Sequence, residues 1–272
     1  MGSKDPGKGK HKSKGTRRIV VPADLLAVMS PGEVTLGRRE SHYVRHVLRM
    51  TVGDDVELMD GLGTSGHGHI SALDDCGVRV ELTEFGQASA MESPLKLTLI
   101  MGMPKGPRWD FIVQKTTELG IDRLLPAYTK HGEVRIPPEK TAARAHRWTR
   151  IATEAARQSG RSVAPEIDIP RPLEQLLELL SHEPDIDLKL MAWESLAGKP
   201  NRKLGEALLA TGARPSHVIL LVGPEGGFAP EEAALAAEHG FTAVSLGPRI
   251  LRAETAAMAM TTLLQHILGD MG

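Results

Sequence analysis

The chain has 272 residues, of which 41% are hydrophobic and 25% are charged. This composition is typical of a soluble globular protein, and the length allows one large domain or two ordinary ones. No apolar run approaches the ~20 residues that a membrane-spanning helix needs. The single cysteine, Cys76, excludes an internal disulfide framework, which agrees with a reducing compartment. We therefore expect a cytoplasmic protein.

Positive charge is concentrated at the N-terminus, although the net charge of the whole chain is −1. Residues 1–18 hold seven basic residues against one acidic residue, Asp5. The seven are Lys4, Lys8, Lys10, Lys12, Lys14, Arg17 and Arg18. Because the segment is rich in Gly and Ser and has no apolar periodicity, residues 1–17 are predicted to form a disordered basic arm. The arm is compatible with a solubilising tail or with weak attraction to nucleic-acid phosphates. A secretory signal is not expected, because no apolar stretch follows the charges.

Residues 18–89 alternate short β-rich runs with turns. Strands are predicted over residues 19–22, 56–59, 66–73 and 78–83. One helix is predicted over residues 42–49, with Ser41 as its N-cap. Short strands separated by regular turns predict a small β-barrel domain. Residues 86–94 have the composition of a linker.

From Leu95 onward the pattern becomes an alternation of strands and helices. Strands are predicted over residues 95–101, 123–129, 187–193 and 218–222, and helices over residues 109–119, 142–159, 173–180 and 255–268. The strand at 218–222 is continuously apolar, as in strands that are covered on both faces. Residues 90–272 are therefore predicted to be an α/β domain with a mostly parallel sheet and flanking helices.

Two glycine-containing turns in the last quarter each lie between an apolar strand and a helix. The first reads Gly223-Pro224-Glu225-Gly226-Gly227, and the second contains Leu246-Gly247. Glycine lets the backbone approach a ligand closely, and neither turn has the spacing of a Walker loop or a dinucleotide fingerprint. Glu225 would repel phosphates, so a ligand with a positive centre, or with hydroxyls and amines, fits better. Tight-turn geometry alone remains an alternative explanation of the glycines.

The second turn continues into Arg249, Arg252 and Glu254. Arginine at such a turn could stabilise a developing anion or hold a phosphate through two hydrogen bonds. An ion pair between Arg252 and Glu254 that caps the last helix would explain the same residues without any ligand.

Both turns, in this order and separation, resemble the cofactor loops of the SPOUT methyltransferases, and specifically those of the RsmE family. Other stretches are similar to this family along nearly the whole chain except the basic arm. They are residues 42–49, 53–54, 60–63, 105–106, 114–120, 148, 154–161, 223–228 and 245–256. The resemblance implies S-adenosylmethionine-dependent methylation of N3 of a uridine in 16S ribosomal RNA, in the small ribosomal subunit. It also implies a PUA-like β-barrel that binds RNA over residues 18–89, a trefoil-knotted methyltransferase domain over residues 90–272, and a homodimer.

The resemblance further implies roles for individual residues. Catalysis is expected from Arg252, Arg249 and Glu254, with Arg252 leading and Glu254 as a possible base, and no metal is required. The cofactor residues are expected to be Gly223, Pro224, Glu225, Gly226, Gly227, Leu246, Gly247, Ile250, Leu251, Arg252, Thr255 and Ala256. From their positive charge, taken together as a possible phosphate track across both domains, the RNA-binding residues are expected to be Lys105, Lys115, Arg144, Arg147, Arg157, Arg161, Arg45 and Arg49. Because N3 lies on the pairing edge of the base, the target uridine must be unpaired or flipped out.

Three other functions remain open at this point. One is a SPOUT methyltransferase that acts on ribose 2′-hydroxyl groups or on transfer RNA. Another is a noncatalytic RNA-binding factor for ribosome assembly that keeps the fold. The third is an α/β protein that binds a nucleotide phosphate with its glycine turns, against which Glu225 argues.

Overall fold

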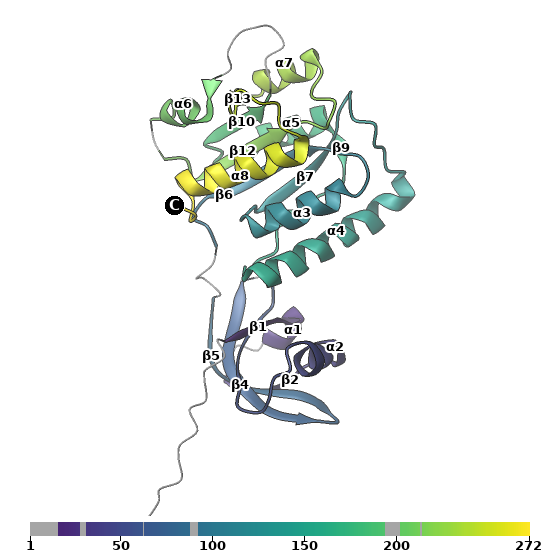
Figure 1. Ribbon diagram of the computed structural model, residues 1–272, viewed down its shortest axis with the longest axis vertical. Helices are drawn as coiled ribbons and strands as arrows, with labels where there is room; N and C mark the ends of the chain where they lie inside the picture. The colour runs from purple at the N-terminus through teal and green to yellow at the C-terminus, as the bar shows by residue number, and fades with distance from the viewer. Residues whose placement is uncertain (1–15, 28–30, 62, 88–91, 194–201, 213) are drawn as a thin grey trace, which may run out of the picture. The chain divides into compact units, whose positions relative to one another are not determined.

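The computed structural model describes residues 16–27, 31–61, 63–87, 92–193, 202–212 and 214–272 (Figure 1). Most of the predicted basic arm lies outside these ranges. The chain divides into two compact units, Met1–Ser89 and Ala90–Gly272. Among the helices in these ranges, none combines the length and the apolar character of a membrane span.

The first unit contains a five-stranded sheet in the order β1-β3-β4-β5-β2. Its strands are β1 (Arg17–Val20), β2 (Gly32–Thr35), β3 (Asp55–Met59), β4 (Thr64–Asp74) and β5 (Gly77–Gln87). β1 pairs with β3 in parallel, and the other neighbours are antiparallel. Along β3, Val56 and Leu58 are buried while Asp55 is exposed. This period of two places one face of the sheet against the core of the unit and leaves the other face to solvent.

A short helical segment covers the buried face of this sheet. It consists of α2 (Arg38–His42), which continues directly into a π-helix, η1 (Tyr43–Val47). The unit also contains a separate short helix, α1 (Ala23–Leu26). Val44 packs into the same core as Val56 and Leu58. The predicted helix starts too late, because Ser41 is not its N-cap: the Ser41 hydroxyl is buried, donates to the Leu36 carbonyl (3.0 Å) and accepts the Val78 N–H (3.1 Å). Ser41 therefore ties the helix to the sheet from within.

The second unit contains an eight-stranded sheet in which every pair of neighbouring strands is parallel. The order is β11-β13-β10-β12-β6-β7-β8, with β9 also paired to β7. The strands are β6 (Lys96–Gly102), β7 (Arg123–Tyr128), β8 (Glu166–Ile167), β9 (Arg171–Pro172), β10 (Leu188–Ala192), β11 (Arg202–Lys203), β12 (His217–Val222) and β13 (Thr242–Ser245). The prediction of a mostly parallel sheet is confirmed.

Helices cover both faces of this parallel sheet (Figure 1). They are α3 (Arg108–Glu118), α4 (Pro138–Ser159), α5 (Leu173–Ser181), α6 (Leu204–Leu209), α7 (Pro230–Glu238) and α8 (Ala253–Leu268). On β12, Val218 and Leu220 pack with α3, α4 and α8, whereas Ile219 and Leu221 pack with α5 and α7. This two-sided packing explains why the β12 sequence is apolar without interruption. α4 ends at Gly160, as predicted, and Gly160 adopts the left-handed conformation with φ of 82°.

His217 at the start of β12 makes the stability of this unit depend on pH. Its side chain is 5% exposed, and burial, followed by the nearby Lys96, lowers its pKa below the ordinary value of 6.5. Below pH 6.5 the unfolded chain therefore binds a proton that the folded chain resists. We expect the free energy of unfolding to decrease as the pH falls from 6.5 toward the lowered pKa.

Urea denaturation at pH 7.5 and pH 5.5 checks this expectation for His217. His217→Gln should reduce the loss of stability between the two pH values, because glutamine does not titrate. His182→Gln, which removes an exposed histidine from the same unit, is the matched control. An unchanged pH dependence in His217→Gln would contradict the assignment.

Candidate functional site

A cavity of about 790 Å³ lies where β6, β10, β12 and β13 reach their carboxyl ends. In open α/β sheets this is the edge at which ligands bind, and the volume is within the ~300–1,000 Å³ of pockets for small ligands. The walls come from the turns that follow all four strands. The order of strands in the sheet thus brings together turns that lie as far apart in the sequence as Lys105 and Ala256.

The two glycine turns both line this cavity. The residues that were expected at a cofactor site and that line it are Gly223, Pro224, Glu225, Gly226, Gly227, Leu246, Gly247, Ile250, Leu251, Arg252 and Ala256, together with Arg249 and Glu254. Thr255 is the exception, because it is exposed and does not line the cavity. Thr255 lies in the first turn of α8 between Glu254 and Ala256, where the helical period directs it away from the cavity wall.

Two glycines in these turns have backbone conformations that other residues rarely adopt. Gly227 has φ of 69° and Gly247 has φ of 121°. The Gly227 N–H donates to the Pro224 carbonyl at 2.9 Å and closes the first turn. Glycine is therefore required at both positions by the backbone itself, so tight-turn geometry contributes to the pattern whatever the cavity binds.

Apolar side chains from the second turn form one wall of the cavity. Leu246 and Leu251 are half-buried, whereas Ile250 is 84% exposed. A ligand that covers an isoleucine with this exposure removes apolar surface from water, which favours binding. The wall is suited to the face of a flat heteroaromatic ring.

Glu225 in the first turn is held by groups from the turn after β6. The Arg108 guanidinium and the Lys105 N–H both donate to its Oε1, the latter at 3.2 Å. Burial opposes ionisation of this carboxyl, but hydrogen bonds from its own N–H, from Arg108 and from Lys105 outweigh burial and keep the pKa of Glu225 below its ordinary value. The Glu225 carboxylate that was predicted to face a ligand thus already has a cationic partner.

Glu254 at the start of α8 has a partner on one oxygen only. Its Oε1 lies 3.9 Å from Nε of the same Arg108, and its side chain is 15% exposed. Its Oε2 is buried and, within the described part of the chain, accepts no hydrogen bond. Buried carboxylate oxygens are almost always hydrogen-bonded, so this oxygen is suited to a donor that is supplied by a ligand. The sequence left open an ion pair between Arg252 and Glu254, but in the structure Glu254 pairs with Arg108.

Arg108 is the functional residue that the sequence analysis missed. It contacts Glu225 of the first glycine turn and Glu254 of the second. A signal was present in the sequence, since Gly106-Pro107 before Arg108 forms a third glycine turn between a strand and a helix. The other lining residues that were not expected at a cofactor site are Lys105, Ala192, Trp193, Val222, Phe228, Val244, Ser245 and Ala253.

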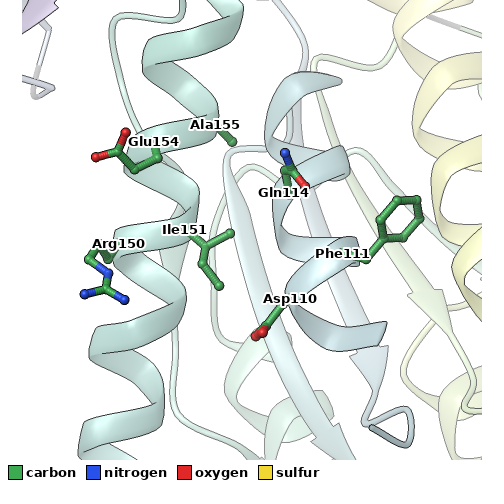
Figure 2. A pocket seen from close by; sticks show the side chains of 7 residues that line it. All are labelled: Asp110, Phe111, Gln114, Arg150, Ile151, Glu154 and Ala155. Atoms are coloured by element: carbon green, nitrogen blue, oxygen red, sulfur yellow. The ribbon is translucent and has the colours of Figure 1, made fainter. Parts of the chain in front are cut away.

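A second cavity of about 450 Å³ lies between α3 and α4 and has no lining residue in common with the first (Figure 2). Figure 2 shows Ile151 of α4 directed toward α3, and Phe111 of α3 directed away from α4. The Arg147 guanidinium of α4 is bonded to the Asp110 carboxylate of α3 beside this cavity. This ion pair joins the two helices.

The residues expected to bind RNA differ in exposure. Exposed members are Lys105, Arg144, Arg147 and Arg49, and half-buried members are Lys115, Arg157 and Arg45. Lys115 is bonded to Glu118 and Arg157 to Glu154 within their own helices.

One of these expectations is wrong in the folded chain, that for Arg161, while Arg45 stays a prediction. Arg161 is 6% exposed, and its guanidinium donates to the Glu92 carboxylate and to the carbonyls of Thr117 and Ile121. Arg45 donates to the carbonyls of Asp74 and Gly77 and thereby anchors η1 to the turn between β4 and β5. The Arg161 guanidinium is not available for a phosphate, because backbone carbonyls and a carboxylate occupy its ε and both η nitrogens. Arg45 uses one nitrogen, Nη2, for both of its carbonyl bonds.

A parallel α/β sheet with a glycine-lined cavity at its carboxyl edge, in a chain that also contains a small β-rich unit, defines a cofactor-binding protein of two units. The profile of the family described as RNA methyltransferase domain matches residues 91–265, and that of the RNA methyltransferase PUA domain matches residues 36–83. The chain therefore belongs to this RNA methyltransferase family. The resemblance to RNA methyltransferases that the two glycine turns indicated is confirmed.

Individual relatives agree with this assignment. The chain is 32% identical over 252 residues to the ribosomal RNA small subunit methyltransferase E of Synechocystis, covering 93% of this chain and 78% of that protein. It is 30% identical to the protein of the same name from Bacillus subtilis, with 84% and 87% covered. A solved structure of the Neisseria gonorrhoeae enzyme bound to S-adenosyl methionine superimposes with a TM-score of 0.78 at 30% identity, with 94% and 100% covered. A methyltransferase structure from Legionella pneumophila in complex with the same cofactor gives 0.76 at 33% identity, with 94% and 99% covered.

Proposed function

We propose that this protein transfers a methyl group from S-adenosylmethionine to N3 of a uridine in 16S ribosomal RNA. Relatives at about 30% identity over most of the chain are ribosomal RNA small subunit methyltransferases, and two structural relatives contain this cofactor. The observation that carries the proposal is a cavity lined by both glycine turns and by Glu254, Arg249 and Arg252, in which the buried Oε2 of Glu254 has no hydrogen-bond partner within the described residues.

The cavity suits S-adenosylmethionine in shape and chemistry. The apolar wall of Leu246, Ile250 and Leu251 would pack on the adenine ring, and the backbone of the two glycine turns would bond its edge. The lining holds two acidic side chains, Glu225 and Glu254, that could face a positive sulfonium, together with the basic Lys105, Arg108, Arg249 and Arg252. When bound, the cofactor supplies an electrophilic methyl group, so the residues of the chain need only prepare the acceptor.

The chain must make uridine N3 nucleophilic, because this imide nitrogen carries a proton near neutral pH. A carboxylate must take the proton, and cations must stabilise the negative charge that spreads over O2 and O4. We assign the proton to the free oxygen of Glu254 and the charge stabilisation to Arg252, assisted by Arg249. With its proton on Glu254 and its charge held by the arginines, N3 would be the nucleophile toward the methyl group that the bound cofactor supplies.

Mass spectrometry of ribosomal RNA tests the proposed reaction in cells. Cells that lack the protein should lose one methyl group from a uridine base of 16S RNA, and the wild-type gene should restore it. A full set of methylated uridines in these cells would refute the proposal. Calorimetry with S-adenosylmethionine separates an enzyme from a noncatalytic assembly factor, which would not bind the cofactor.

The organisation of the active protein is part of the proposal. Residues 18–89 are assigned to RNA binding and residues 90–272 to methyl transfer, in the cytoplasm. We place a trefoil knot in the last segment, which is supported by the return of α8 onto α3, β6 and β12 after the second glycine turn. A homodimer is supported by exposed apolar side chains on packed helices, namely Phe111 of α3 and Leu263 and Ile267 of α8.

Arg108→Ala should weaken cofactor binding more than it slows the reaction. The arginine joins the two glycine turns through Glu225 and Glu254, and its removal leaves both carboxylates without this cation. We expect the Kd of S-adenosylmethionine to rise about tenfold, or ~1.4 kcal/mol, because the two turns that line the cavity lose the side chain that joins them. Calorimetry measures the Kd, with Arg144→Ala as an exposed arginine control on α4. A Kd equal to that of the wild type would contradict a role for Arg108 in joining the turns.

A further inference from the structure

The exposed side of the α2–η1 segment in the first unit carries cations and imidazoles. We call it the helical basic surface and define it by Arg38, Arg39, His42, His46 and Arg49, all of which are exposed. The rings of His42 and His46 contact each other, with centroids 4.5 Å apart and planes tilted by 40°. Beside them Val47 is 60% exposed. The surface thus combines positive charge with flat and apolar groups.

The other side of the same segment is fixed to the unit, which determines which residues face outward. Ser41 and Val44 are buried, and Arg45 is bonded to the carbonyls at the turn between β4 and β5. The only acidic residue in the segment is Glu40, which is half-buried. The five residues of the helical basic surface are therefore exposed to solvent on a segment whose position is fixed by packing and hydrogen bonds.

Arg49 at the end of this segment has a strained backbone. Its φ is 52°, in the left-handed region, while the following Met50 N–H donates to the Val44 carbonyl at 3.1 Å. Glycine is the usual residue in such a helix-terminating position, and a larger side chain there costs conformational free energy. A long cation at a position that favours glycine indicates a function for the side chain.

The solvent face of the sheet in the same unit has the opposite charge. Asp55, Glu81 and Glu33 lie in one cross-strand row with His69, and Glu57 and Glu84 lie in the next row with His67. His69 lies 3.4 Å from Glu81, and His67 lies 3.5 Å from Glu57. Cations on this face are already paired, Arg18 with Glu57 and Arg79 with Glu33 and Asp74. A phosphate backbone would be repelled by this face.

We propose that the helical basic surface is where the first unit docks a single-stranded segment of the RNA substrate. Arg38, Arg39 and Arg49 would bind phosphates, and the His42 and His46 rings would stack on bases, as aromatic and imidazole groups do in RNA-binding proteins. This inference rests on the proposed function, since it names the surface that holds the RNA whose uridine is methylated.

Fluorescence anisotropy with a labelled 12-nucleotide oligouridylate tests the surface in the full chain at several salt concentrations. Arg38→Gln/Arg39→Gln/Arg49→Gly should weaken binding about tenfold and lower the slope of log affinity against log salt by ~0.7 for each phosphate that is no longer bound. Glycine at position 49 suits the left-handed backbone, so this change should not unfold the unit. His42→Ala/His46→Ala should weaken binding about tenfold for each base–ring stack that is lost, and should lower the salt slope less than the arginine variant does.

Controls separate this surface from general electrostatics and from the proposed reaction. Arg17→Gln removes an exposed arginine from β1 of the same unit and should have little effect. An equal fall in affinity in Arg17→Gln, or wild-type affinity and salt slope in the triple variant, would refute the docking surface. Binding of S-adenosylmethionine should be unchanged in all these variants. If RNA binding follows this pattern but the wild-type protein methylates no uridine, the proposed function fails and the docking surface stands.

Discussion

Arg252→Ala should reduce kcat for uridine methylation by about 10²–10³-fold, the usual loss when one donor to a developing anion is removed. The Kd of S-adenosylmethionine should stay within about threefold of the wild type, since the cofactor contacts that we expect from this segment come mainly from its backbone and apolar side chains. Arg252 is exposed, lines the cavity and is the N-cap of α8. No ion pair to Glu254 holds its guanidinium among the described residues, so the side chain is available to the uridine.

The measurement combines single-turnover methylation of 16S RNA with calorimetry of cofactor binding. Arg252→Lys keeps the charge but loses the planar fork, so its rate should lie between those of the wild type and the alanine variant. Added guanidinium ions should restore part of the Arg252→Ala rate. Arg202→Ala removes an exposed arginine of β11 that does not line the cavity and serves as the matched control. Wild-type turnover in Arg252→Ala would remove this residue from the mechanism.

The fold could be predicted from the sequence wherever local pattern determines structure. The apolar run of β12 and the glycine after α4 each specify their own element through burial on two faces and through the left-handed cap. The start of α2 could not be predicted, because Ser41 has the chemistry of an N-cap while its partners, Leu36 and Val78, come from packing against β5. Hydrogen bonds between elements that are distant in sequence leave no local signal.

In the site, too, residues that local conformation restricts could be predicted, whereas residues whose role depends on distant partners could not. Gly227 and Gly247 were found because their backbone conformations limit the residue type. Arg108 was missed because its importance comes from Glu225 and Glu254, more than a hundred residues further along the chain. Arg161 was placed on the surface because charge alone predicts exposure, and only the fold brings Glu92 close enough to hold it inside.

Glu254→Gln should lower the methylation rate by about 10²–10⁴-fold at neutral pH, the range for loss of a general base. The carboxylate has one oxygen toward Arg108 and a second, Oε2, that is buried without a partner in the described chain. Glutamine keeps the size of the side chain and can still accept from Arg108, but it cannot take the proton from N3. The variant should therefore recover as the pH rises, because N3 then loses its proton to solvent without help from the enzyme.

The pH profile distinguishes a base from a residue that only positions Arg252 or Arg108. If Glu254 accepts the proton, the wild-type rate becomes independent of pH once this carboxyl is ionised, while the Glu254→Gln rate keeps rising about tenfold per pH unit. If Glu254 acts only through the arginines, the two profiles have the same shape at different heights. Glu225→Gln is the matched control, since Glu225 shares the Arg108 contact and should change the KM for S-adenosylmethionine without steepening the pH profile. Parallel pH profiles for the wild type and Glu254→Gln would show that Glu254 is not the base and that another group accepts the proton.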